Sequence, residues 1–312
     1  MFADNVHYRE YQRLLVELHA LIAAGRNQSS DATQLRNLME RAEANLSEDE
    51  IVRLNALSAD LSMIHDREVP DPDVVAHVPT QDVPRLIESA LRGHRWEDVL
   101  ELLRAGASHL WSADQIAYVR SRAYEGIDEL TPSVAFMDEA ARRAPDNANY
   151  RALSLRLLWQ SKRHQEAYSR ARDYLTDPKT EPRLVLISGG ILAQRAMQLH
   201  APADLNTVAK MAVQRMQQVL PFETSPNLIF AALVSLGLLA IQVDDTSAAA
   251  NAFRDALQVA TTSDEQVTSS WALNRELELV RKGKAKTAEE RSNARQLAEL
   301  VQPSPVAAPV RT

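Results

Sequence analysis

Two arginines in equivalent positions of a repeating pattern are the residues best suited to bind a charged ligand. Arg122 and Arg156 are 34 residues apart, and Asn, Gln, Tyr and Trp residues flank them. The planar guanidinium group of arginine binds a carboxylate through two parallel hydrogen bonds, and aromatic side chains supply contact area for a partner. The chemistry predicted from these residue types is recognition of an acidic or carboxylate-bearing peptide.

The residue sets that indicate catalysis do not occur in the sequence. There is no Gly-Lys-Ser/Thr for a phosphate-binding loop and no Gly-x-Ser-x-Gly for a serine nucleophile, and Gly189-Gly190 lacks the spacing of a dinucleotide site. No histidine follows a glutamate by three residues, and no two histidines lie three or four residues apart. We therefore predict a protein that is not an enzyme and uses no cofactor and no metal. An enzyme built on helical hairpins is the least favoured alternative.

Composition and charge narrow the class of protein further. The 312 residues include only 8 glycines, which favours helix, and no cysteine, which excludes disulfides and thiolate metal sites. The net charge of −7 argues against a general nucleic-acid-binding protein, because such a protein needs a basic face. The apolar run at residues 228–243 is shorter than the about 20 residues that cross a membrane, and the first ten residues do not resemble a secretory signal. We expect a cytoplasmic protein with neither nucleic acid nor membrane as a partner.

The spacing of 34 residues also recurs in the apolar pattern. A fixed period of this length is typical of stacked helical hairpins, each of which is too small to bury its own apolar face. An all-α fold is therefore predicted. The sets of residues that keep the spacing are Trp96, Leu130 and His164; Val99, Ser133 and Ala167; and Leu103, Met137 and Ala171.

Helix-capping and proline signals divide the chain into four segments. Residues 1–66 are predicted to form an N-terminal helical bundle or cap, and prolines mark residues 67–81 as a linker. Residues 82–301 are predicted to form the helical array, of which the last two helices, in residues 264–301, cap the end. Residues 302–312 contain three prolines without an amphipathic pattern, so we expect a disordered tail.

Several helix ends are predicted from local residue patterns. Gly25 lies where a C-terminal cap belongs, and Ser47 with Glu50 has the form of a capping box. A second capping box is predicted at Ser112 with Gln115. Thr131-Pro132 is predicted to be an N-cap followed by a proline at the first helical position.

The hairpins of residues 82–262 resemble the tetratricopeptide repeat family. The repeat of that family has 34 residues, with an aromatic residue near the end of the first helix, alanine and large apolar residues on the second, and a closing proline. The best match runs from Ala140 to Pro145 and is preceded by Tyr124 and Met137. The resemblance implies an α-α superhelix, a solenoid of helical hairpins with an additional N-terminal helical segment. Another kind of α-hairpin array is the alternative.

The resemblance also implies where a ligand binds. In tetratricopeptide proteins the first helix of each hairpin lines a concave groove, and fixed positions on these helices contact the ligand. For the arginines the alternative is a solvated surface, and for Trp159 it is packing between helices. The matching positions in this chain also include Glu88, Glu125 and Ala152, and the residues predicted to contact the partner are Arg92, Gln115, Tyr118, Arg122, Asn149, Arg156, Trp159 and Gln160.

The functional hypothesis that follows is a scaffold that binds a peptide segment of a partner protein in this groove and so assembles a complex. The alternative is a structural factor in which residues 1–66 drive homo-oligomerisation and the array serves as a spacer.

Overall fold

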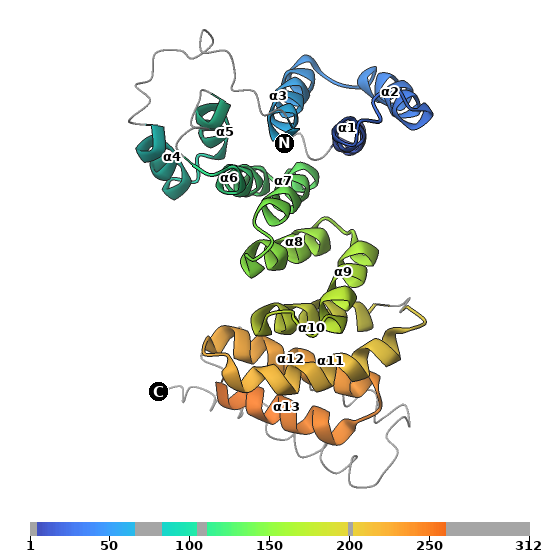
Figure 1. The fold of residues 1–312 in the computed structure, drawn as a ribbon, viewed down its shortest axis with the longest axis vertical. Coiled ribbons are helices and arrows are strands. Elements are labelled where there is room, and N and C mark those ends of the chain that lie inside the picture. The colour runs from blue at the N-terminus through green and yellow to red at the C-terminus, as the bar shows by residue number, and fades with distance from the viewer. Residues whose placement is uncertain (1–4, 66–82, 105–110, 199–201, 260–312) are drawn as a thin grey trace, which may run out of the picture. The chain divides into compact units, whose positions relative to one another are not determined.

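The computed structural model describes residues 5–65, 83–104, 111–198 and 202–259 (Figure 1). These ranges contain α-helices, one 3-10 helix and no strand, which confirms the predicted all-α fold. The chain splits into two compact units, Met1–Lys162 and Arg163–Thr312. The predicted linker at 67–81, the predicted capping helices at 264–301 and the predicted tail at 302–312 lie outside the described residues.

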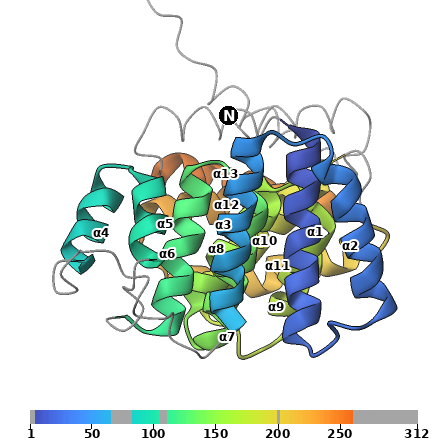
Figure 2. The same cartoon turned by 90° about the horizontal axis from the view of Figure 1, so that it is seen from above.

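In the first unit, helices that follow one another from α4 to α8 pack in sequence, and α1 packs on α2, α3 and α7. Figure 2 shows α3 between α1 and α6. One apolar core runs through α1–α7 and includes Leu57, Ile87 and Phe136, all 0% exposed. The helices before and after the predicted linker therefore share a core. The helices of this unit are α1 Val6–Ala23, α2 Ser30–Glu43, α3 Glu48–His65, α4 Val83–Arg92, α5 Trp96–Arg104, α6 Ala113–Gly126, α7 Leu130–Arg143 and α8 Ala148–Gln160.

In the second unit, α10 packs against α9, α11 and α12, and α12 packs against α13. Glycine permits two of these contacts, because a Cβ on Gly189 would lie 2.1 Å from Met216 Sδ and one on Gly237 would lie 2.5 Å from the Phe253 ring. The apolar run at 228–243 forms the buried helix α12, and no described helix is long and apolar enough to cross a membrane. The elements are α9 His164–Thr176, α10 Pro182–Ala196, α11 Leu205–Val219, η4 Leu220–Phe222, α12 Pro226–Gln242 and α13 Thr246–Val259.

The spacing of 34 residues is present in the helix boundaries. Three helices, α5, α7 and α9, begin at Trp96, Leu130 and His164, which keep this spacing. Two further sets of residues with this spacing lie inside these helices and have exposed fractions of 2% or less, so each helix presents the same side to a core. They are Val99, Ser133 and Ala167, and Leu103, Met137 and Ala171. The repeat seen in the sequence is therefore a repeat of local structure.

The turns before these helices share one backbone conformation. His94, Asp128 and Lys162 have positive φ values of 54°, 64° and 63°, again at a spacing of 34 residues. In the first two turns, the next residue donates its N–H to the carbonyl five residues earlier: Arg95 to Ala90 and Glu129 to Tyr124, both at 2.9 Å. This pattern is the Schellman ending of a helix. The turn between α12 and α13 repeats it, with Asp244 at φ 63° and Asp245 donating to Ala240 at 2.9 Å.

Most of the predicted helix ends are confirmed. Gly25 has φ 71° and ends α1 as a left-handed cap. At the start of α3, Ser47 N donates to Glu50 Oε2 at 2.7 Å and Glu50 N donates to Ser47 Oγ at 3.3 Å, which is a capping box. The box at Ser112 and Gln115 is also present.

The prediction for the start of α7 is wrong. The helix begins at Leu130 with Glu129 as its N-cap, so Pro132 occupies the third helical position. A proline is tolerated there because the first N–H groups of a helix have no partner within it. The N-cap residue Glu129 also contacts distant residues through its side chain, as described below.

Candidate functional site

The two arginines predicted to act together do meet in the structure. Arg122 Nη1 on α6 donates to Glu125 Oε2 at 2.5 Å. Arg156 Nη2 on α8 donates to both oxygens of the same carboxylate, at 2.8 and 3.1 Å. The side chains keep part of their surface in contact with solvent, with exposed fractions of 33% for Arg122, 43% for Arg156 and 18% for Glu125. One carboxylate thus joins the two helices and holds both guanidinium groups near each other.

Aromatic residues make the second contact between α6 and α8. The ring of Tyr118 stacks on that of Tyr150, with centroids 5.4 Å apart and planes at 28°. The Tyr150 hydroxyl donates to Asp114 Oδ2 at 3.2 Å. Burial, and then the charge of Asp114, raise the pKa of Tyr150 to about 12, so the phenol stays protonated and acts as a donor. We use the name α6–α8 face for Tyr118, Arg122 and Glu125 of α6 with Tyr150 and Arg156 of α8.

The other predicted site residues are not part of the α6–α8 face. Gln115 is exposed, and its side-chain oxygen accepts a backbone N–H at 3.2 Å as part of the capping box. Asn149 is exposed in the first turn of α8, while Trp159 is half-buried and Gln160 exposed at its end. Arg92 is exposed on α4 and donates to a backbone carbonyl of its own helix at 3.3 Å. Within the described ranges no hydrogen bond or ion pair joins Arg92 to the α6–α8 face.

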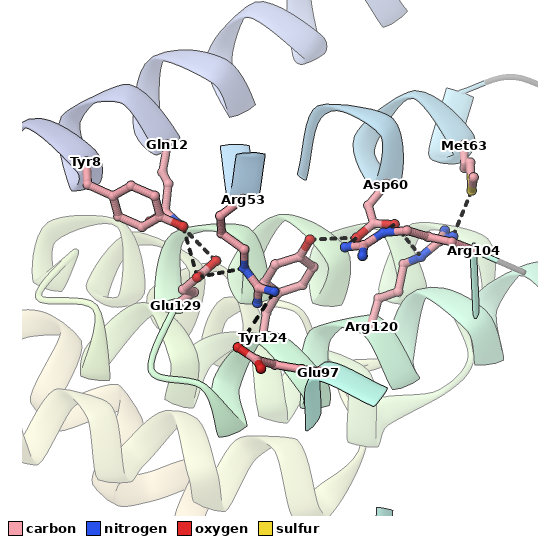
Figure 3. Close-up of polar contacts among 10 residues, drawn as sticks. All are labelled: Tyr8, Gln12, Arg53, Asp60, Met63, Glu97, Arg104, Arg120, Tyr124 and Glu129. Carbon is pink, nitrogen blue, oxygen red and sulfur yellow. Dashed lines mark hydrogen bonds and ion pairs between the residues drawn. The ribbon is translucent and has the colours of Figure 1, made fainter. Parts of the chain in front are cut away.

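A second group of polar and charged residues, most of them buried, lies where α1 and α3 meet the region from α5 to α7. Sequence reasoning did not find it. We call this group the buried network (Figure 3). Its members are Tyr8, Gln12, Arg53, Asp60, Met63, Arg104, Arg120, Tyr124 and Glu129, and the exposed Glu97 lies at its edge, 4.0 Å from Arg53.

One end of the buried network is centred on Glu129, whose exposed fraction is 4%. Oε1 accepts from the Tyr8 hydroxyl at 3.0 Å and from Arg53 Nε at 3.1 Å, and Oε2 accepts from Gln12 Nε2 at 2.8 Å. Burial raises the pKa of Glu129, and the charge of Arg53 only partly offsets it. Donors from α1 and α3 therefore hold the carboxylate that begins α7.

The other end is centred on Asp60, which is 0% exposed on α3. Arg104 donates two hydrogen bonds to it, from Nε to Oδ1 at 2.9 Å and from Nη2 to Oδ2 at 2.7 Å. The Tyr124 hydroxyl donates to Oδ2 at 2.6 Å, and burial raises the pKa of that phenol well above its ordinary value. This end ties α3 to both α5 and α6.

Cation–aromatic contacts connect the two ends. The Arg53 guanidinium carbon lies 5.8 Å from the centre of the Tyr124 ring. Arg120, 4% exposed, lies at the same distance from the Phe136 ring, donates to Met63 Sδ at 3.0 Å and has Nε 3.8 Å from Asp60 Oδ1. Burial lowers the pKa of Arg120. The tyrosines are protonated donors and the carboxylates are paired, so the network is suited to fixing how the helices dock.

Sequence spacing could hardly reveal the buried network, because its contacts join residues far apart in the chain. Tyr8 and Glu129 are separated by 121 positions, and Asp60 and Tyr124 by 64. One local signal exists: Asp60 lies three residues after Leu57 and one before Leu61, on the apolar side of α3. A carboxylate in that position predicts a buried cationic partner, although not which one.

Neither the family models nor the curated proteins give a match to this chain. Within the described ranges, no group of three or more His, Asp or Glu side chains is placed to hold a metal ion.

Proposed function

We propose that the protein is a non-enzymatic, tetratricopeptide-like scaffold that binds an acidic peptide segment of a partner protein at the α6–α8 face. The observation that carries the proposal is the convergence of Arg122 and Arg156, from two helices, on the single carboxylate of Glu125. Both guanidinium groups remain partly exposed, at 33% and 43%. They are close enough together to engage one incoming acidic group.

The repeated local structure supports the tetratricopeptide-like part of the proposal. Helix starts and left-handed turn residues recur every 34 residues, the length of that repeat. Tyr124 lies near the end of α6, where the family has an aromatic residue, and Ala140 is 0% exposed on α7. In such an array α6 and α8 are the first helices of neighbouring hairpins, which are the helices that bind ligands.

Charge and hydrogen-bonding capacity favour an acidic partner. A guanidinium group has five N–H donors, and Glu125 accepts from only one nitrogen of each arginine. Two arginines and one glutamate leave the cluster with an excess positive charge. Charged groups at a partly exposed site accelerate association with a partner of opposite charge and exclude partners of like charge. The Tyr118–Tyr150 stack beside the cluster adds aromatic surface for neighbouring peptide atoms.

The buried network gives the N-terminal helices a role within this scaffold. Asp60 on α3 binds Tyr124 on α6, the helix that carries Arg122 and Glu125. Docking of α3 therefore supports one side of α6 while the other contacts α8. Homo-oligomerisation through residues 1–66 stays a prediction.

The test is a binding measurement with matched variants. Peptides selected from a random display library against the full-length chain would be titrated by fluorescence anisotropy. Arg122→Gln with Arg156→Gln should weaken binding of acidic peptides by several-fold, up to about 30-fold, because each of the two ion pairs at the protein surface contributes up to about 1 kcal/mol. The control, Arg13→Gln, removes an arginine that is 52% exposed and paired with Glu17, and should leave affinity unchanged. Unchanged binding by the double variant would remove the α6–α8 face as the site.

A further inference from the structure

Arginine pairs held by one glutamate occur at three places in the described chain, and one of them differs in kind. At two places both arginines lie on the helix of the glutamate or in its cap, within four residues of it. At the third, Arg156 comes from another helix, 31 residues from Glu125. The three sets are Glu139 with Arg142 and Arg143, Glu166 with Arg163 and Arg170, and Glu125 with Arg122 and Arg156.

The position of Glu125 is the position that a ligand carboxylate would take under the proposed function. Its two oxygens lie 2.8 and 3.1 Å from Arg156 Nη2, and one of them lies 2.5 Å from Arg122 Nη1. A carboxylate arriving from a partner would find these donors already occupied. It must displace Glu125 or share the arginines with it.

Exchange of one carboxylate for another at this place costs little. Ion pairs at a protein surface contribute only about 0–1 kcal/mol, because water solvates the separated charges well. Glu125 is 18% exposed and the two arginines are 33% and 43% exposed, so water reaches part of this cluster, whereas Asp60 is 0% exposed. Glu125 can turn away from the arginines without leaving a buried charge unpaired.

We infer that Glu125 is an internal competitor at the α6–α8 face, where its carboxylate occupies the arginines until the aspartate or glutamate side chain of a bound peptide replaces it. This inference rests on the proposed function and adds the chemical group recognised and the residue that sets its affinity. The occupant is an acidic side chain because the group now seated between the arginines is itself a glutamate side chain. Glu125 restricts binding to peptides whose acidic group can outcompete it.

The experiment measures affinity for a defined probe. A Gly/Ser peptide with one central glutamate and an amidated C-terminus would be titrated into full-length protein, followed by the arginine Nε–Hε NMR signals. Glu125→Gln should bind this peptide about 2–5-fold more tightly than wild type, the factor that corresponds to losing a surface pair. Glu125→Ala should show the same gain. Glu166→Gln, which removes the glutamate that pairs with Arg163 and Arg170, is the matched control and should show no gain.

The outcomes separate the inference from the proposed function. If both Glu125 variants bind equally or more weakly while Arg122→Gln with Arg156→Gln also weakens binding, the competitor role is wrong and the binding site stands. If the double arginine variant binds like wild type, the proposed function itself fails. A companion peptide with a central glutamine and a free C-terminus tests the group recognised. Tighter binding of that companion would overturn the assignment to an acidic side chain.

Discussion

The buried network and the α6–α8 face use the same chemistry in two different environments. In both, arginines from one helix hold a carboxylate on another: Arg104 with Asp60 inside, and Arg156 with Glu125 at the surface. Asp60 is 0% exposed and Glu125 is 18% exposed. Inside the protein, separating the pair would leave charges without water, so the contact fixes the fold. At the surface water can replace either partner, so the contact remains exchangeable.

The partners of the two carboxylates differ accordingly. Asp60 and Glu129 each accept hydrogen bonds from a tyrosine hydroxyl and from an arginine. These bonds occupy much of the accepting capacity of the two carboxylates. Glu125 has arginine donors that keep N–H groups toward solvent. A buried carboxylate without partners is costly, so both interior carboxylates accept from several donors. Partial satisfaction at the surface leaves capacity for a partner.

The largest effect is expected from breaking the buried pair. Asp60→Asn removes the charge that Arg104 and Arg120 contact, and leaves Arg120, which is 4% exposed, and Arg104, which is 22% exposed, without that anion. Unfolding free energy, measured by urea titration, should fall by about 3–5 kcal/mol, the cost of breaking a buried ion pair. The double variant that also carries Arg104→Met should recover part of this loss. A loss below about 1 kcal/mol for Asp60→Asn would show that the interior pair behaves like a surface pair.

An intermediate effect is expected from pH, with opposite signs for two glutamates. Burial raises the pKa of Glu129, so its contribution to stability is complete below the ordinary glutamate value of 4.5 and declines as the pH rises through the raised value. Burial also acts to raise the pKa of Glu139, but hydrogen bonds from Arg142 and Arg143 outweigh it and lower the pKa. The contribution of Glu139 is therefore present above 4.5 and declines as the pH falls through the lowered value.

Urea titrations of wild type, Glu129→Gln and Glu139→Gln at pH values below and above 4.5 would test whether the two glutamates affect stability with opposite pH dependence. The unfolding free energy of wild type minus that of Glu129→Gln should decrease with rising pH. The unfolding free energy of wild type minus that of Glu139→Gln should increase with rising pH. A pKa displaced by one pH unit corresponds to about 1.4 kcal/mol. Slopes of the same sign for both variants would contradict the contrast between burial and ion pairing.

The smallest effect is expected at the surface cluster. Glu125→Gln should change the unfolding free energy by no more than about 1 kcal/mol, because the pair is solvated. The change should shrink further in about 1 M salt, where screening acts within about 3 Å. A loss of several kcal/mol, insensitive to salt, would mean that Glu125 is a structural residue like Asp60.

Short-range features of the fold were predictable from the sequence. The capping boxes at Ser47 and Ser112 and the cap at Gly25 depend on residues close together in the chain, and all three are present. The repeat of 34 residues was visible because buried positions accept only apolar or small side chains. It also placed Arg122 and Arg156 together, since equivalent positions of adjacent repeats become neighbours in space.

Features that depend on distant contacts were not predictable in the same way. Thr131-Pro132 carries a good local signal for a helix start, but α7 begins earlier, at Leu130, and Tyr8, Gln12 and Arg53 bind the side chain of its N-cap residue Glu129. Local propensity gives way where a tertiary contact supplies more stabilisation. The left-handed turns at His94 and Lys162 also lack the glycine that usually marks them.

The sequence by itself determined the all-α character, the repeat and the pair of arginines, because helix formation and periodic burial depend on residue type and spacing along the chain. Only the tertiary structure decided which carboxylate each arginine meets and how far water reaches it. Glu125 and Glu129 are four residues apart, yet one is 18% exposed on the α6–α8 face and the other is 4% exposed in the buried network. Their roles differ because the cost of separating an ion pair depends on solvent access, which arises from packing of helices distant in the chain.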